Sequence, residues 1–165
     1  MRRTSSVGLR ARTCAVALVA MFAATALVAQ PAAATTPSEG SGSFAFTAPP
    51  TVTITRSADG NTFLTLTGGE TMTGPLTGTN TLRITLDIHS SGESNLNGII
   101  TCTCRVGGRS GTVELRIEGT GTAAADDGQF VLQNGTAGLA DLRGEGTFHS
   151  VGAAGTYTVR WHFEP

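Results

Sequence analysis

Strict alternation of apolar and polar residues is the feature of this chain that most restricts its fold. Apolar side chains fall at every second position in three segments, which are residues 82–88, 113–117 and 157–163. Successive side chains of a β-strand point to opposite faces, whereas one face of a helix repeats every three or four residues. Each segment therefore predicts a strand with one buried face.

Shorter apolar segments also predict strands, and pairs such as Asn-Gly, Asp-Gly and Gly-Gly between them indicate turns. The weaker strands are expected at residues 44–46, 52–54, 63–66, 100–104 and 130–132. No window sustains a helical period for three turns, and only Leu139 and Leu142 allow a single helical turn. About eight short strands, each with one apolar face, predict an all-β protein built as an antiparallel barrel or a sandwich.

The first 34 residues predict a secretory signal peptide. Four arginines precede an apolar stretch at residues 15–29, and three alanines at 32–34 form a cleavage site. The apolar stretch is shorter than the roughly 20 residues that span a bilayer. We therefore expect a signal peptide at residues 1–34, a flexible polar linker at 35–42 and a β-barrel domain at 43–165. The mature protein is then secreted or held in the cell envelope, without membrane insertion.

The charge of the expected mature chain argues against nucleic acid and anionic membranes as partners. Loss of four of the eleven arginines leaves seven against twelve acidic residues, a formal charge of −5, and the chain has no lysine. Binding to nucleic acid depends on neutralising phosphates, and binding to anionic membrane surfaces depends on basic clusters. This surface supplies neither.

Glycine-rich motifs in the second half of the chain resemble those of a known family. They are Gly107-Gly108-Arg109-Ser110-Gly111-Thr112, Gly119-Thr120, the run at residues 135–146, and the last strand at 157–163. In these the chain resembles an uncharacterised bacterial family of small allene-oxide-cyclase-like β-barrel proteins, which are more distantly dirigent-like. The resemblance implies an antiparallel β-barrel of about eight strands, and no catalytic residue is carried over by it. Gly144 and Gly146, two residues apart, also fit the strand bending that barrel closure needs.

Cys102 and Cys104 are the only thiols that remain after Cys14 leaves with the signal peptide. An exported protein favours a disulfide between them. Residues i and i+2 of a regular strand hold their β-carbons about 6 to 7 Å apart, whereas a disulfide needs about 3.8 Å. A bridge thus predicts a local bulge or turn. Two buried free thiols and a metal or redox pair are the alternatives.

Other residue types that carry chemistry do not converge in the sequence. The histidines are isolated: His89, His149 and His162. Ser110 lacks the spacing of a nucleophile elbow. Arg143 and Glu145 lie on one side of their strand and are expected to form a surface ion pair, with a binding role as the alternative. We predict no catalytic residue, no metal site and no cofactor.

The function expected from the sequence is a non-enzymatic binding or interaction module. A barrel of about eight strands is either packed solid or holds one small ligand, and we favour the packed interior. If it binds a small apolar ligand, the large side chains expected to line it are Phe44, Phe46, Tyr157, Trp161 and Phe163. The alternative is a cyclase- or isomerase-like enzyme acting on a small apolar substrate. Such an enzyme requires an inward polar group with a perturbed pKa, for which Glu70 is the candidate. The sequence leaves the oligomeric state open.

Overall fold

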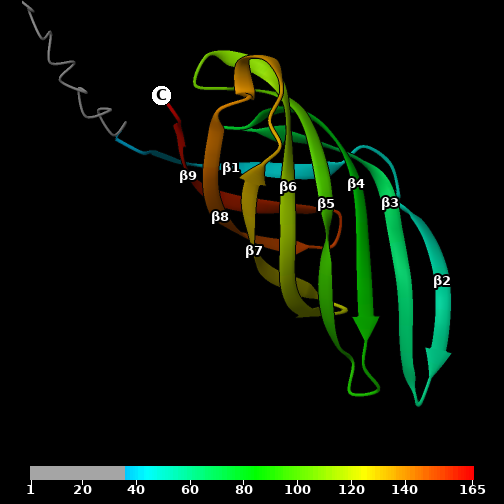
Figure 1. The fold of residues 1–165 in the computed structure, drawn as a ribbon. Coiled ribbons are helices and arrows are strands. Elements are labelled where there is room, and N and C mark those ends of the chain that lie inside the picture. The colour runs from blue at the N-terminus through cyan, green and yellow to red at the C-terminus, as the bar shows by residue number, and fades with distance from the viewer. Residues whose placement is uncertain (1–35) are drawn as a thin grey trace, which may run out of the picture. The chain divides into compact units, whose positions relative to one another are not determined.

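A computed structural model describes residues 36–165, and the expected signal peptide lies outside them. The described residues form nine strands and one short 3-10 helix, η1, and Figure 1 labels the strands along the ribbon. The elements are β1 (Ser38–Phe46), β2 (Thr51–Ala58), β3 (Asn61–Thr73), β4 (Thr77–Ile88), β5 (Glu93–Val106), β6 (Arg109–Thr122), β7 (Ala125–Gln133), η1 (Ala137–Leu139), β8 (Leu142–Val151) and β9 (Ala154–Phe163). Within residues 36–165 no helix is long and apolar enough to cross a membrane.

The strands close into an antiparallel barrel through the pairing of β1 with β3. The sheet runs in the order β1-β9-β8-β7-β6-β5-β4-β3-β2, and β1 returns to β3 between Ser43–Phe46 and Glu70–Thr73. The first half of β3 pairs instead with β2. Eight strands thus close the barrel, and β2 extends the wall beyond the closure (Figure 1). The predicted fold class is confirmed.

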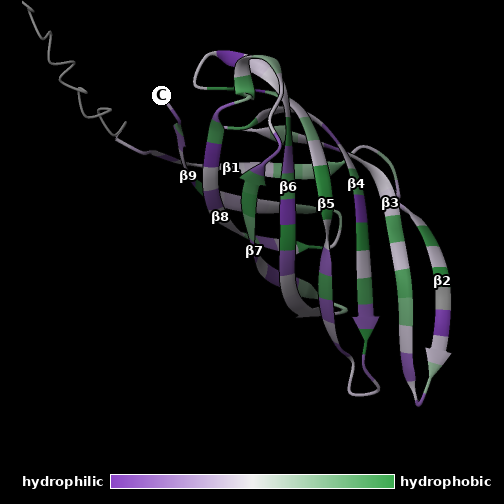
Figure 2. Ribbon diagram, viewed as in Figure 1, coloured by the Kyte–Doolittle hydropathy of each residue, from purple (hydrophilic) through white to green (hydrophobic). Residues whose placement is uncertain are grey.

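The alternation seen in the sequence divides the strands into inner and outer faces. Buried positions recur at every second residue of β5, where Ile100, Cys102, Cys104 and Val106 all face the core. Figure 2 shows the corresponding change between hydrophobic and hydrophilic residues along the strands. The barrel hides its apolar residues on one face because the period of the sequence matches the pleat.

One end of the barrel is packed solid. Leu76, Leu139, Leu142, Val106 and Val113 are fully buried there. Leu139 comes from η1, the single helical turn that the sequence allows, and Leu142 opens the next strand. Arg109 lies 4.0 Å from the centre of the Phe163 ring at the β5–β6 turn.

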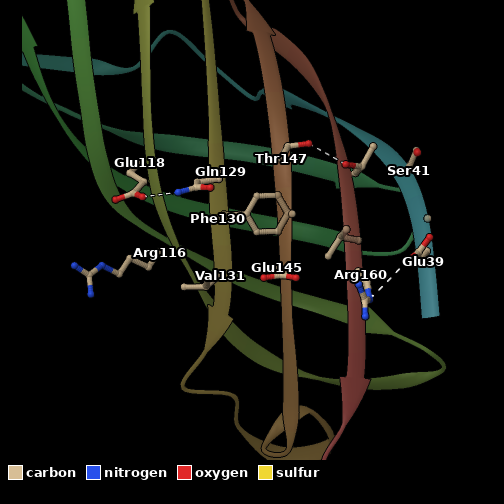
Figure 3. Close-up of a pocket in the computed structure, with 14 residues that line it drawn as sticks. Glu39, Ser41, Arg116, Glu118, Gln129, Phe130, Val131, Glu145, Thr147 and Arg160 are labelled. Carbon is tan, nitrogen blue, oxygen red and sulfur yellow. Dashed lines mark hydrogen bonds and ion pairs between the residues drawn. The ribbon is translucent and has the colours of Figure 1, made fainter. Parts of the chain in front are cut away.

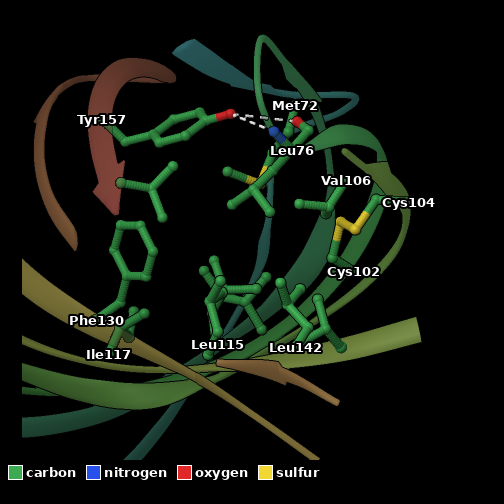
Figure 4. Close-up of a cluster of buried hydrophobic side chains, with 14 of the residues drawn as sticks. Met72, Leu76, Cys102, Cys104, Val106, Leu115, Ile117, Phe130, Leu142 and Tyr157 are labelled. Atoms are coloured by element: carbon green, nitrogen blue, oxygen red, sulfur yellow. Dashed lines mark hydrogen bonds between the residues drawn. A yellow bond between two sulfur atoms is a disulfide. The ribbon is translucent and has the colours of Figure 1, made fainter. Parts of the chain in front are cut away.

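Cys102 and Cys104 form a disulfide, drawn among the core residues in Figure 4. Their Cα atoms are 5.5 Å apart, within the range that disulfides require. The register of β5 with both neighbouring strands runs through the two cysteines without interruption. The expected bulge is therefore wrong, because the strand draws the two residues together within a regular ladder.

The barrel begins earlier than the sequence predicts. Residues 38–42 were expected to belong to a flexible linker, but they form the first half of β1 and pair with β9. The pairing is made by backbone groups, which a polar, glycine-rich segment supplies as well as an apolar one.

The predicted ion pair between Arg143 and Glu145 is also wrong. Arg143 binds Glu164, with Nη2 and Oε2 2.8 Å apart. Adjacent β8 and β9 bring the end of the chain beside Arg143, and local spacing along one strand does not reveal this partner.

Candidate ligand-binding cavity

The other half of the barrel contains a cavity of about 520 Å³. Its walls come from β1, β3–β9 and the β1–β2 loop, and its surface is mostly apolar. Because the opposite end is packed solid, the packed interior that we favoured holds for only one half of the barrel. A volume of this size lies within the range of small-molecule sites, about 300–1,000 Å³.

Of the five aromatic rings that line this cavity, four lie opposite glycines on the adjacent strand. The cross-strand pairs are Phe44 with Gly155, Tyr157 with Gly42, Phe130 with Gly146, and Phe148 with Gly128. In each pair a Cβ on the glycine would overlap the ring. The missing side chain lets the ring rest against the neighbouring backbone, which holds it at the barrel wall. Gly146 thus has a packing role that its sequence context did not indicate.

The structure divides the five aromatic residues proposed from the sequence. Phe44, Phe46 and Tyr157 line the cavity, whereas Trp161 and Phe163 pack at the solid end. Trp161 lies opposite Gly144, two positions along β8 from the Gly146–Phe130 contact. Alternation along β9 gives all three of its large residues the same inward face, but it does not show where along the barrel the interior opens.

Phe130 and Phe148 belong to the cavity wall and were missed as site residues. Phe130 begins a predicted strand segment, and both residues occupy inward positions of their strands. A search for aromatic residues at inward positions of β7 and β8 would have found them.

Glu70 is the buried acidic group of the cavity. It lies on the inward face of β3, in step with Leu66 and Met72, and only 4% of its surface is exposed. Asn80, directly opposite on β4, donates a hydrogen bond from Nδ2 to Oε1 of Glu70 at 2.7 Å. Burial raises the pKa of Glu70, and the bond from Asn80 opposes that rise.

The Glu70–Asn80 pair has spare capacity to accept hydrogen bonds. Among the described residues, no donor reaches Oε2 of Glu70. Oδ1 of Asn80, itself buried, also has no partner in the described part of the chain. Buried polar atoms are normally paired, so the unpartnered Oδ1 of Asn80 is unusual.

A second carboxyl group, Asp126, faces the cavity from β7. Ser150 on β8 lies opposite and donates to Oδ2 of Asp126 at 3.4 Å. Burial raises the pKa of Asp126, and the nearby charge of Asp127 raises it further, while the bond from Ser150 opposes the rise. The cavity is therefore acidic at two points of its wall.

Tyr157 fixes one side of the cavity. Its hydroxyl accepts a hydrogen bond from the backbone N–H of Leu76 at 3.0 Å and donates to the carbonyl of Thr73 at 2.9 Å. Figure 4 shows the ring reaching across the core toward Leu76. Burial raises the pKa of Tyr157, so this hydroxyl stays neutral at physiological pH.

The β1–β2 loop and the β8–β9 turn contribute Pro49, Pro50, Gly152 and Ala153 to the lining, and we call this end of the cavity its mouth. Beyond it, Val52 and Ile54 of β2 are opposite Leu66 and Leu64 of β3 and remain 53% and 66% exposed. The apolar lining thus continues out of the barrel onto β2.

A larger hollow of about 940 Å³ lies on the outer face of β6–β9 and β1 (Figure 3). Most of its polar side chains form hydrogen bonds or ion pairs with one another. Gln129 donates to Glu118 at 2.6 Å, and Arg160 lies 3.8 Å from Glu39. These groups are exposed and already partnered, so the inner cavity is the better candidate site.

Comparison with known proteins places the chain in a family. The model of the family described as "Protein of unknown function (DUF3224)" matches residues 40–161. The chain belongs to the DUF3224 family. The match covers nearly the whole barrel, including both Glu70 and Asp126. No curated protein matches the chain significantly.

A solved DUF3224 structure has the same fold. The protein comes from Shewanella oneidensis MR-1 and is described as having unknown function. It shares 17% sequence identity with this chain at a TM-score of 0.67, and the alignment covers 78% of this chain and 98% of that one. At this identity the similarity supports the barrel fold alone.

Proposed function

We propose that this DUF3224 protein is an exported, non-enzymatic barrel that binds one small, mainly apolar ligand in its interior. The observation that carries the proposal is the 520 Å³ cavity with an aromatic wall and a buried carboxyl group. Apolar walls supply binding free energy in proportion to the surface they remove from water, and a few polar groups fix the orientation of the ligand.

Export is part of the proposal and rests on the signal-like residues 1–34. It predicts that protein recovered from the medium or envelope begins near Thr35, which amino-terminal sequencing would determine. Recovery of the intact chain, beginning at Met1, would contradict it.

A neutral, environment-sensitive dye such as Nile red tests the cavity. We expect its emission to rise and shift to the blue with the wild-type protein. Leu86→Trp places a large ring inside the cavity and should weaken dye binding at least about tenfold, which corresponds to 1.4 kcal/mol. Ile99→Trp on the outer face of β5 is the matched control, since its side chain points away from the interior.

Thermal melts of both variants separate loss of binding from loss of folding. If Leu86→Trp is unfolded, the smaller change Ile84→Phe at the same wall replaces it. Unchanged dye emission with the wild-type protein, or equal binding by Leu86→Trp and Ile99→Trp, would overturn the proposal.

A second candidate function is an isomerase or cyclase acting inside the barrel. The observation in its favour is Glu70, a buried carboxyl facing the cavity with a raised pKa. Such a group can donate its proton to a substrate oxygen and recover one from a neighbouring carbon, which completes an isomerisation without a cofactor. The resemblance to allene-oxide-cyclase-like barrels supports this alternative.

The enzymatic alternative predicts conversion of a small apolar epoxide, such as limonene oxide, to an isomeric alcohol or ketone. Glu70→Gln keeps the shape of the side chain but has no acidic proton, so it should abolish the reaction. Product formation would be followed by gas chromatography with mass spectrometry. A wild-type rate equal to that of Glu70→Gln would remove Glu70 from any catalytic role.

A further inference from the structure

We propose that the ligand of this cavity is a hydrophobic monoamine, whose ammonium group binds at Glu70 and whose apolar body lies among the aromatic rings. This inference rests on the proposed function and names the chemical class of its ligand. It follows from the balance of donors, acceptors and charges on the cavity wall.

The charged residues of the wall all have one sign. Glu70 and Asp126 are its acidic members, and no arginine or histidine is among the described residues that line it. The other titratable group is Tyr157, whose hydroxyl is bound to the backbone of the β3–β4 turn. An anionic ligand would find no counter-charge here, whereas a cation would face a carboxyl group on β3 and another on β7.

In its charged form, Glu70 adds a free acceptor and no donor to the cavity wall. Glu70 uses one oxygen to accept from Asn80 and has the other without a donor in the described part of the chain. Oδ1 of Asn80 and Oδ1 of Asp126 are also without partners among residues 36–165, but they are buried away from the cavity, and Asp126 Oδ1 lies beside Gly121. The acceptor open to a ligand is therefore the second oxygen of Glu70. An ammonium group is a charged donor with no acceptor, which suits a carboxylate oxygen that lacks a donor, while an alcohol is a neutral donor.

Burial of an ammonium group is favourable only where an opposite charge lies beside it and acceptors bind its N–H donors. The carboxylate of Glu70 provides a charge-assisted hydrogen bond, roughly twice as strong as a neutral one. Phe44, Phe46, Phe130 and Phe148 line the same cavity and supply its apolar wall. A monoamine with one compact apolar body uses both kinds of surface.

The raised pKa of Glu70 predicts the direction in which the affinity for an amine changes with pH. Without ligand, burial favours the neutral carboxyl. An ammonium group favours the carboxylate, so binding must release the proton wherever Glu70 is protonated. Affinity for an amine should therefore fall as the pH is lowered through the raised pKa, and Asp126 should act in the same direction.

Isothermal titration with three ligands of equal chain length tests the inference: 1-octylamine, 1-octanol and octanoic acid. At pH 7.5 we expect the amine to bind at least about tenfold more tightly than the alcohol, and the acid to bind most weakly. In Glu70→Gln the preference for the amine should disappear while the affinity for the alcohol stays within about threefold. Glu118→Gln on the outer face is the control and should change neither.

The outcomes separate this inference from the proposed function. If octanol and Nile red bind but octylamine binds no more tightly than octanol, the amine inference is overturned and the binding function stands. If neither octanol nor Nile red binds, the binding function itself fails. If Glu70→Gln does not fold, the wild-type protein decides: a preference for amine over alcohol that does not decline between pH 7.5 and pH 4.5 would overturn the role of Glu70.

Discussion

Glu70 shows how the burial of a single carboxyl group affects stability. The carboxyl group is buried in an apolar wall with one amide donor, so its charged form is poorly compensated. Natural proteins retain such groups where a ligand or a reaction uses them, at some cost in stability. The free energy of unfolding should therefore depend on whether Glu70 is protonated.

Glu70→Gln should reduce the pH dependence of stability. Burial raises the pKa of Glu70 in the folded protein above its ordinary value of 4.5. Its favourable contribution is complete below pH 4.5, where both states are protonated, and is lost as the pH rises through the raised pKa. The wild-type free energy of unfolding should thus fall toward neutral pH relative to that of Glu70→Gln.

Urea denaturation of the wild type and Glu70→Gln from pH 4 to pH 8 measures this difference. Asp126→Asn serves as a second variant, because burial raises the pKa of Asp126 in the same direction. Parallel pH profiles for the wild type and Glu70→Gln would show that the carboxyl is solvated in the folded protein.

Tyr157→Phe should destabilise the fold by about 1–3 kcal/mol. The change removes only the hydroxyl, which leaves the buried N–H of Leu76 without its acceptor. Thr158→Val is the neighbouring control on the outer face, where the exposed hydroxyl pairs with that of Thr147, and it should cost less than about 0.5 kcal/mol. Denaturant melts that ranked the two variants equally would contradict the role of the Tyr157 hydrogen bonds.

At the level of strands, glycine and aromatic residues act as cross-strand pairs. Each of four glycines on β1, β7, β8 and β9 leaves space for a ring that lines the cavity. The rings are thereby held against the wall by backbone, and the interior of this half of the barrel stays open. The glycine-rich composition is part of how the cavity is made.

Gly146→Ala should destabilise the protein by about 1–3 kcal/mol, because the added methyl would overlap both the backbone carbonyl of Thr158 and the ring of Phe130. Gly68→Ala is the matched control, since its nearest neighbour, Pro50, lies at ordinary contact distance. The two changes are compared by chemical denaturation. A double-mutant cycle with Phe130→Leu should recover part of the loss, and strict additivity would refute the proposed pairing.

At the level of the whole molecule, the barrel has two unlike halves and one appended strand. The solid end contains the fully buried leucines and the disulfide, while the cavity occupies the other end. β2 pairs only with β3 in the described structure and leaves Val52 and Ile54 exposed beside the mouth. The closed barrel should therefore resist local unfolding more than β2 does.

Amide hydrogen exchange should detect this difference in local stability. We expect β2 to exchange at least about tenfold faster than β5 and β6, because it has one ladder of hydrogen bonds and little buried surface. Mass spectrometry of peptides from the three strands makes the comparison within one sample. Protection of β2 equal to that of β5 would show that another surface covers its free edge.

Much of the architecture followed from local pattern. Alternation in residues 82–88, 113–117 and 157–163 predicts their strands and their inward faces, because the pleat imposes a period of two. The same parity gave Phe44, Phe46 and Tyr157 their inward positions. Parity did not extend to Glu70, because the strand expected at residues 63–66 ends before it, whereas β3 continues through Gly68 and Gly69 to Thr73.

The remaining features depended on which strands meet and in what register. Closure of β1 on β3, the Asn80 donor for Glu70, the partner of Arg143 and the glycine opposite each ring are all contacts between strands. No periodicity along one strand specifies them. Whether the interior is filled or hollow is decided last, because it depends on how the summed side chains of all eight closed strands fill the space that the barrel encloses.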